Sequence, residues 1–215
     1  MRILACALAL ALPAGQDFDK TKHQWGKWKV DTRIKFKMTI EVGGQSIEGE
    51  YRSALTELKD KEYTLRHASS VMGAEQEEFE TETYGEKKGE EKIKVGDQEH
   101  ECVVWASSGK RGEKELSSRL WIPAGKETPL KMTWKAGDDE SGEFTATKMS
   151  ENLSAGGKDY DCVLLEGEMT SPELGGTLKG KMWMHPSVPG GVVRLDLSGD
   201  QAKIAVELAD VDAKK

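Results

Sequence analysis

Apolar residues occupy every second position over residues 33–42, and charged or polar residues occupy the positions between them. A period of two is typical of a strand with one buried face. The apolar members are Ile34, Phe36, Met38, Ile40 and Val42. Gly43 and Gly44 follow, and glycine accepts the positive φ angles of a two-residue hairpin turn. The pattern predicts a strand, a tight turn and a return strand.

The alternation continues along the next two segments. Residues 47–55 place Ile47, Gly49, Tyr51, Ser53 and Leu55 on one face. Residues 63–71 place Tyr63, Leu65, His67, Ser69 and Val71 on one face. Strands joined in sequence by short turns indicate an antiparallel meander.

The pattern is weaker over residues 75–84. One face would carry Phe79, Thr81 and Thr83, and the other would carry Glu78, Glu80 and Glu82. We interpret the glutamates as a solvated face of an edge strand, where charge discourages pairing with other chains. Residues 85–91 are rich in charge, and we expect a turn or linker there.

One block of sequence occurs twice. Residues 96–104 and 156–164 share a glycine turn, acidic positions and a cysteine followed by valine, and each leads to a segment with tryptophan and proline. A degenerate third copy begins at residue 42. Such repetition implies that one supersecondary unit is used again to extend a sheet. We place the repeats at about 42–94, 95–150 and 155–210.

These patterns predict a mainly β fold: a curved antiparallel meander of about eleven strands, with at most a short N-terminal helix over residues 18–24. The apolar face must bury itself, so the sheet curls into a half-barrel or barrel, or folds into a sandwich. The concave apolar face is the candidate ligand site, formed by Ile34, Phe36, Met38, Leu65, Met132, Trp134 and Leu195. Trp121 and Trp183 fall on the opposite parity of their strands. They lie either at an exposed rim or in a second small core.

Cys102 and Cys162 occupy the same position in two repeats. Equivalent strands in an open sheet lie several strand spacings apart, beyond the reach of a disulfide. We therefore expect two buried thiols, and a Cys102–Cys162 disulfide is the alternative if the sheet closes on itself.

The first residues have the form of a secretory signal peptide. Met1 and Arg2 precede an apolar run over residues 3–12, and small residues follow. We predict a cleaved signal over residues 1–15 and a single β domain over residues 16–215, in a secreted or periplasmic protein. No later segment is apolar enough for a membrane span.

Charge narrows the classes of partner. The chain has 31 Lys and Arg against 38 Asp and Glu, a formal net charge of −7. Nucleic-acid binding requires a clustered basic patch, so this balance argues against it.

Candidate chemistry is sparse. The sequence has four histidines and no Gly-x-Ser-x-Gly elbow, and we interpret His67 as a packed or hydrogen-bonded core residue. Residues 182–185 offer thioether and imidazole groups for copper, and residues 138–140 offer carboxylates for calcium. Core methionines and an acidic hairpin turn explain these two segments better. We expect no catalytic residues, no metal and no cofactor.

Residues 160–163 and 181–193 combine a strand, a tryptophan-containing strand, a Pro-Gly-Gly corner and a further strand. This arrangement resembles the lipoprotein-carrier-like proteins, the LolA and LppX group, over residues 95–208. The resemblance implies a strongly curved antiparallel half-barrel whose concave face accepts lipid chains. It carries over no binding residue, and the chain lacks the helices that plug that half-barrel.

Two functions follow as expectations. The first is a non-enzymatic protein that binds a lipid or another apolar ligand on the concave face. The second is an envelope structural or protein-interaction module with a protein partner and no small ligand. A metal-dependent or hydrolytic enzyme is a more remote alternative.

Overall fold

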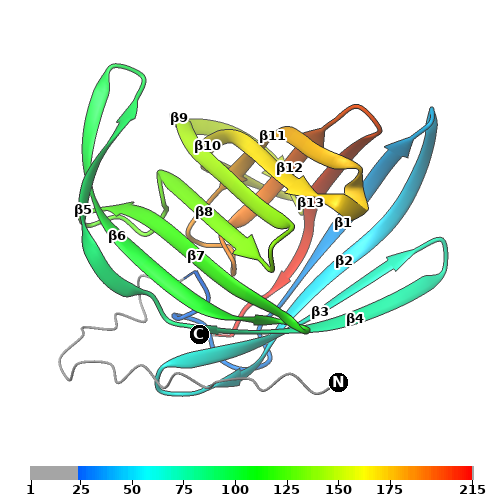
Figure 1. The fold of residues 1–215 in the computed structure, drawn as a ribbon, viewed down its shortest axis with the longest axis horizontal. Helices are drawn as coiled ribbons and strands as arrows, with labels where there is room; N and C mark the ends of the chain where they lie inside the picture. The colour runs from blue at the N-terminus through cyan, green and yellow to red at the C-terminus, as the bar shows by residue number, and fades with distance from the viewer. Residues whose placement is uncertain (1–23, 215) are drawn as a thin grey trace, which may run out of the picture.

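The computed structural model describes residues 24–214, and Figure 1 shows that these residues are dominated by β-strands. Thirteen strands follow one another within these described residues. Their bounds are β1 Arg33–Val42, β2 Gln45–Leu58, β3 Glu62–Val71, β4 Ala74–Thr83, β5 Glu86–Val95, β6 Gln98–Arg111, β7 Lys114–Pro123, β8 Lys131–Ala136, β9 Glu140–Ala155, β10 Lys158–Ser171, β11 Gly176–Met184, β12 Val192–Ser198 and β13 Ala202–Asp212. One turn of 3₁₀ helix, Pro172–Leu174, joins β10 to β11.

The strands form one antiparallel sheet in the order β4-β3-β2-β1-β13-β12-β11-β10-β9-β8-β7-β6-β5. A further pairing of β4 with β6 closes twelve of them into a barrel and leaves β5 outside the ring. The predicted antiparallel meander built from hairpins is therefore confirmed. Of the arrangements left open by the sequence, the structure has the closed barrel.

The segment expected to be a charged turn is instead part of a strand. β5 covers residues 86–95 and pairs with β6. Ile93 and Val95 are buried at its far end, while most of its charged side chains remain exposed. Apolar and charged residues alternate only at the end of this segment, around Ile93 and Val95. The charged residues before them therefore predict a turn and not a strand. The expected signal peptide over residues 1–15 lies outside the described residues, as does the expected short helix apart from Gln24.

The internal repeat has a structural counterpart. The hairpins β1–β2, β5–β6 and β9–β10 turn at Gly43, Gly96 and Gly156, with φ of 58°, 59° and 55°. The second strand of each hairpin has 14 residues. Both later copies also carry a β-bulge where β5 meets β6 and where β9 meets β10, so the same local bend recurs.

Trp121 and Trp183 show how closely the copies correspond. The indole N–H of Trp121 donates to Glu91 at 2.8 Å, and that of Trp183 donates to Glu151 at 3.0 Å. Both indoles are buried, with exposed fractions of 5% and 8%. The two tryptophans are therefore packing residues rather than exposed contacts for a partner.

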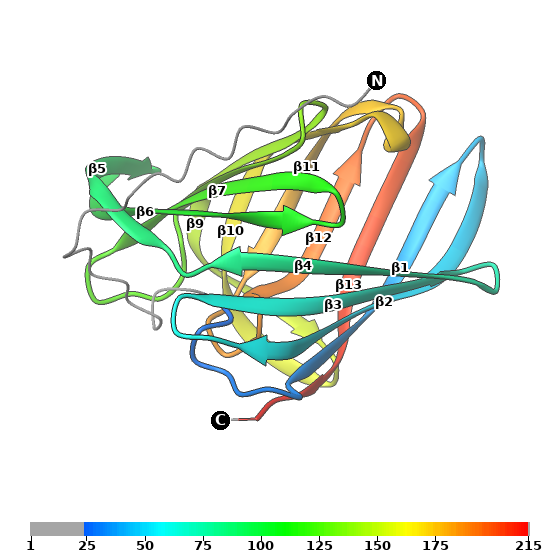
Figure 2. The same cartoon turned by 60° about the horizontal axis from the view of Figure 1, so that its bottom comes forward.

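The chain segment before β1 packs against one end of the barrel (Figure 2). Trp25 and Trp28 are buried there in the same apolar cluster as Phe36 and Leu55. Backbone hydrogen bonds join Lys29 to Lys214, beyond β13, and Gln24 to Gly190, between β11 and β12, so this segment is held across the barrel end. The barrel is consequently filled by side chains at this end.

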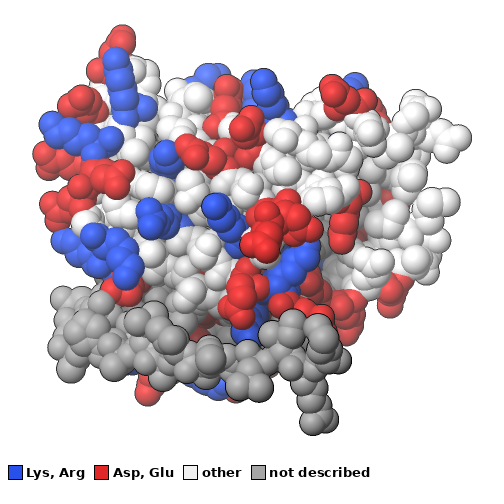
Figure 3. Space-filling model, viewed as in Figure 1, with Lys and Arg blue, Asp and Glu red and all other residues white. Residues whose placement is uncertain are grey.

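Lysine, arginine and acidic side chains are interspersed over the face seen in Figure 3. This distribution matches the charged positions between the inward-facing residues of each strand. Among residues 24–214, no helix is long and apolar enough to cross a membrane.

Candidate functional site

The barrel wall is weakest where β4 meets β6. Only three residue pairs join these strands, Glu80 with Arg111, Thr81 with Lys110 and Glu82 with Gly109. Every other pair of neighbouring strands in the barrel is joined by five residue pairs or more. We call this short contact the seam.

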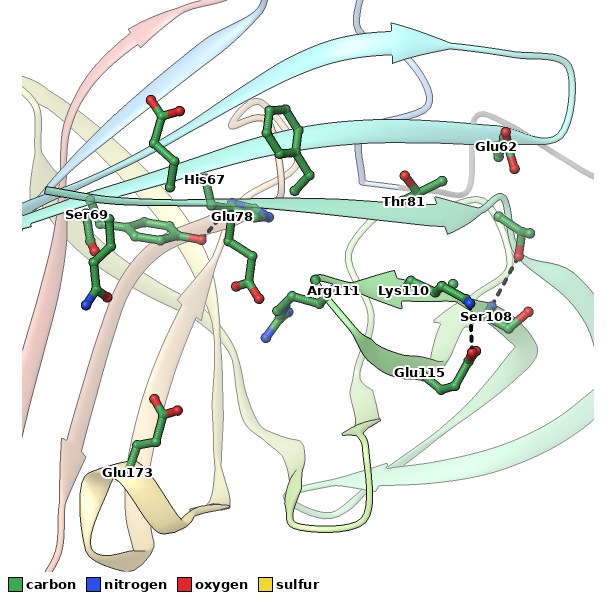
Figure 4. Close-up of a pocket in the computed structure, with 17 residues that line it drawn as sticks. Glu62, His67, Ser69, Glu78, Thr81, Ser108, Lys110, Arg111, Glu115 and Glu173 are labelled. Atoms are coloured by element: carbon green, nitrogen blue, oxygen red, sulfur yellow. Dashed lines mark hydrogen bonds and ion pairs between the residues drawn. The ribbon is translucent and has the colours of Figure 1, made fainter. Parts of the chain in front are cut away.

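A cavity of about 1310 Å³ lies beside the seam (Figure 4). Its lining includes the consecutive residues 76–79 of β4 and 108–112 of β6 and the following turn. Successive side chains of a strand point to opposite faces of a sheet. A cavity that touches several consecutive residues on both strands therefore lies between their edges, as a slit through the barrel wall. Glu78 and Arg111 point into it from opposite sides, and Glu173 lies beyond them.

His67 lies on the inner side of the slit, held by two hydroxyl groups. Its Nδ1 is 2.7 Å from the Tyr51 hydroxyl and 2.8 Å from the Ser53 hydroxyl. The rings of Tyr51 and His67 stack with their centroids 5.6 Å apart. When Nδ1 accepts from these hydroxyls, the ring proton lies on Nε2. Burial raises the pKa of Tyr51 to about 12, so this residue stays a neutral donor.

Glu80 is the charged centre of the site. Arg111 donates to its Oε2 through Nε and Nη2, each at 2.7 Å, and His67 Nε2 lies 3.7 Å from the same oxygen. The side chain of Glu80 is 8% exposed. Burial alone would raise the pKa of Glu80, but the adjacent His67 imidazole and the Arg111 charge outweigh it and lower the pKa to about 2. Glu80 and Arg111 are thus a buried ion pair across the seam.

Glu82 lies two residues further along β4 and is held by hydroxyl groups. It accepts hydrogen bonds from Tyr63 and Ser107, and from Ser118 at 2.8 Å. The guanidinium of Arg111 also lies 5.8 Å from the ring centroid of Trp134 on β8. Polar contacts therefore run inside the barrel from Tyr51 on β2 to Trp134, and we call the chain Tyr51–His67–Glu80–Arg111 the polar belt.

The seven residues predicted for the concave apolar face divide into two groups. Ile34, Phe36 and Leu65 are buried, with exposed fractions of 5% or less, and belong to the packed core. Met38, Met132, Trp134 and Leu195 are only half-buried. The register places Met38 and Leu195 on either side of Val206, on the same inner face. Only this second group leaves apolar surface inside the barrel for a ligand.

The expected orientation of β4 is wrong. Glu80 and Glu82 are each 6% exposed and point into the barrel, while Phe79 points outward and is 54% exposed. The register explains this, because Leu65 lies opposite Glu80 and Tyr63 opposite Glu82 on β3. Local alternation alone predicts a solvated face of glutamates, because the interior partners of Glu80 and Glu82 are distant in the chain. In the sequence, the position of His67 on the apolar face of β3 indicates that polar groups lie inside the barrel.

Cys102 and Cys162 are both free and buried. They lie on β6 and β10, and three strands separate these in the sheet order. Burial raises the pKa of each thiol to about 11. Neither cysteine lines the slit, and both have the character of inert core residues.

The segments considered for metals serve other purposes. Asp139 and Glu140 form ion pairs with Lys114 at 3.3 and 2.7 Å. His185 is hydrogen-bonded to Ser187 at 2.7 Å. Within residues 24–214, no group of three or more histidine, cysteine or acidic side chains is arranged to hold a metal ion.

No protein-family model and no curated protein matches the sequence significantly. The structure is a barrel-like antiparallel meander, which is compatible with the fold of the lipoprotein-carrier-like group but does not by itself assign the chain to that group.

Proposed function

We propose that the protein binds an amphipathic small molecule inside the barrel. The apolar part of this ligand would lie against Met38, Met132 and Leu195. Its polar group would lie at the polar belt, within reach of Tyr51, His67 and Arg111. Secretion through the predicted signal peptide forms part of the proposal, because it would expose the barrel to extracytoplasmic ligands.

One observation carries this proposal: the large slit at the seam is lined on its inner side by Tyr51, His67 and Arg111. Binding sites for small molecules combine apolar walls with a few placed polar groups. Here the half-buried apolar residues and the polar belt lie on the inner face of one barrel. The contact of Arg111 with the Trp134 ring joins the two groups.

The geometry favours binding over catalysis. Ser53 lies 2.8 Å from His67 and Glu80 lies on the other side of the imidazole, which superficially matches a nucleophile, a base and an acid. However, Ser53 is only 3% exposed, and Tyr51 shares the same imidazole nitrogen. A substrate carbonyl would have to reach a buried hydroxyl, so we assign these residues to structure and to ligand recognition.

The test uses adjacent residues that point to opposite faces of β8. Met132 faces the interior, and Thr133 faces outward. The probe is dansylundecanoic acid, a fluorescent fatty acid, titrated into the purified full chain. We expect Met132→Glu to weaken binding at least tenfold, about 1.4 kcal/mol, and Thr133→Glu to leave it within twofold.

Circular dichroism of both variants must match that of the unsubstituted protein for this comparison to count. Equal affinity of the two variants would contradict an internal site. A second measurement, native mass spectrometry of the protein isolated from its own source, should show a discrete added mass that solvent extraction removes. Failure to bind the probe together with a bare native mass would overturn the proposal.

A further inference from the structure

Among the described residues, no strand pairs with one edge of β4 over its first half. Residues 74–79 pair with β3 on one side, whereas pairing with β6 begins only at Glu80. The Phe79 carbonyl accepts from the Gly112 N–H at 3.0 Å, so the backbone groups of residue 79 point away from β3. Because this direction alternates along an antiparallel strand, the N–H and C=O of Glu75 and Glu77 also point away from β3.

Residues 74–79 are all exposed, and Glu77 lies at the slit. Gln76, Glu77, Glu78 and Phe79 all line the slit, and Gly112 lines it where the slit meets the next turn. Within residues 24–214 no other strand pairs with this stretch of β4. An unpaired edge beside a cavity is the arrangement by which sheets accept an added strand.

The charges around this edge define the kind of strand that fits. Glu75, Glu77, Glu78 and Glu173 form no ion pair within the described residues, and Figure 4 shows Glu78 and Glu173 directed at the opening. Of the cations that line the slit, Lys110 pairs with Glu115 and Arg111 with Glu80, while the exposed Arg66 of β3 lies near Glu77 on the outer face. Phe79 adds one exposed apolar side chain on the outer face.

A second copy of this chain fits the edge poorly. Two β4 edges placed side by side would bring like-charged glutamates opposite each other, which destabilises an antiparallel pair. Charged edges also discourage indiscriminate pairing. The complementary partner is a different polypeptide with basic residues.

We propose that residues 74–78 of β4 accept an extended, basic segment of a partner protein as an additional strand. Main-chain hydrogen bonds to Glu75 and Glu77 would hold it, and the surrounding carboxylates would select lysine or arginine side chains. This proposal does not rest on small-molecule binding inside the barrel.

The probe is a capped eight-residue peptide of alternating lysine and valine, and its counterpart has alternating glutamate and valine. We expect the basic peptide to bind the full chain and to protect the amides of residues 75 and 77 from hydrogen exchange. Binding should weaken as salt increases, because salt screens exposed charges. The acidic peptide should bind at least tenfold more weakly.

Two variants separate main-chain pairing from charge attraction. Glu77→Pro removes an N–H that points away from β3, a position where a strand edge tolerates proline, and should abolish binding with little loss of stability. Glu77→Gln keeps the N–H and should weaken binding severalfold. Glu168→Gln, at an exposed position of β10 that pairs with both β9 and β11, is the matched control and should have no effect.

Several outcomes would overturn the proposal. These are no binding of the basic peptide, equal binding of the two peptides, protection located away from β4, or unchanged affinity in a folded Glu77→Pro variant. Met132→Glu should lose affinity for the fluorescent fatty acid but retain affinity for the basic peptide. Failure of the small-molecule proposal can therefore be distinguished from failure of this one.

Discussion

At the scale of single residues, the interior holds two carboxylates in different ways. Glu80 is paired with a guanidinium, whereas Glu82 receives hydrogen bonds from hydroxyl groups. A buried charge is costly unless it is paired and hydrogen-bonded. The ion pair of Glu80 with Arg111 also joins the two strands of the seam, so its loss would affect closure of the barrel as well as local stability.

Glu80 should make stability depend on pH in the acid range. Its pKa falls from an ordinary 4.5 to about 2 in the folded chain. A lowered pKa contributes stability above about pH 4.5, and this contribution of roughly 3 kcal/mol disappears as pH falls from 4.5 towards 2. Glu80→Gln should therefore lose about 2–4 kcal/mol at pH 7, because Arg111 remains without its partner.

Urea unfolding at pH 7, 4 and 2.5 measures this effect. The curves of Glu80→Gln and of the unsubstituted protein should converge as pH falls. Glu48→Gln, at an exposed position, should follow the unsubstituted protein throughout. Parallel curves for Glu80→Gln would show that the carboxylate is not ionised in the pair.

At the scale of the strands, glycines sit where neighbouring backbones approach most closely. A Cβ on Gly109 of β6 would lie 1.9 Å from the carbonyl oxygen of Thr81, and a Cβ on Gly167 of β10 would lie 2.0 Å from that of Glu143. These are 14-residue strands of corresponding hairpins. Glycine in a strand interior often marks a bend at a barrel corner, and both positions fit that role.

Gly167→Ala should therefore be strongly destabilising. The added methyl group would meet rigid backbone, and β9 and β10 would have to separate. We expect a loss of about 2–3 kcal/mol, which corresponds to a decrease in melting temperature of roughly 5–10 °C. Glu166→Ala, next to it on the outer face, is the control. Similar melting temperatures for the two variants would mean that β10 can bend without glycine.

Local alternation predicts individual strands well where one face is apolar. Residues 33–42 form a strand with the predicted bounds, and His67 lies on the inner face of β3 with its neighbours Leu65 and Tyr63. The same reasoning reversed the faces of β4, because a glutamate is compatible with the interior only if a distant partner such as Arg111 is supplied. That partner comes from a strand that reaches β4 only when the barrel closes. The slit was therefore beyond prediction from local pattern.

At the scale of the whole molecule, twelve strands form a ring whose closing contact is the shortest. The segment before β1 packs across one end of the ring, and the slit opens beside the closing contact. Separating β4 from β6 requires breaking few backbone pairs, but it also breaks the Glu80–Arg111 ion pair. The wall is thus most easily widened at the seam, beside the slit through which we propose that the ligand enters.

A disulfide across the seam tests this role. Thr81 and Lys110 lie directly opposite each other, so Thr81→Cys/Lys110→Cys should oxidise readily, while the native thiols are buried. If ligand passes through a widened seam, the oxidised variant should take up dansylundecanoic acid at least tenfold more slowly, and reduction should restore the rate. Lys37→Cys/Glu50→Cys, across β1 and β2, locks a fully paired contact and is the control. Equal uptake by the oxidised and reduced seam variant would mean that the slit admits the ligand without any separation of β4 from β6.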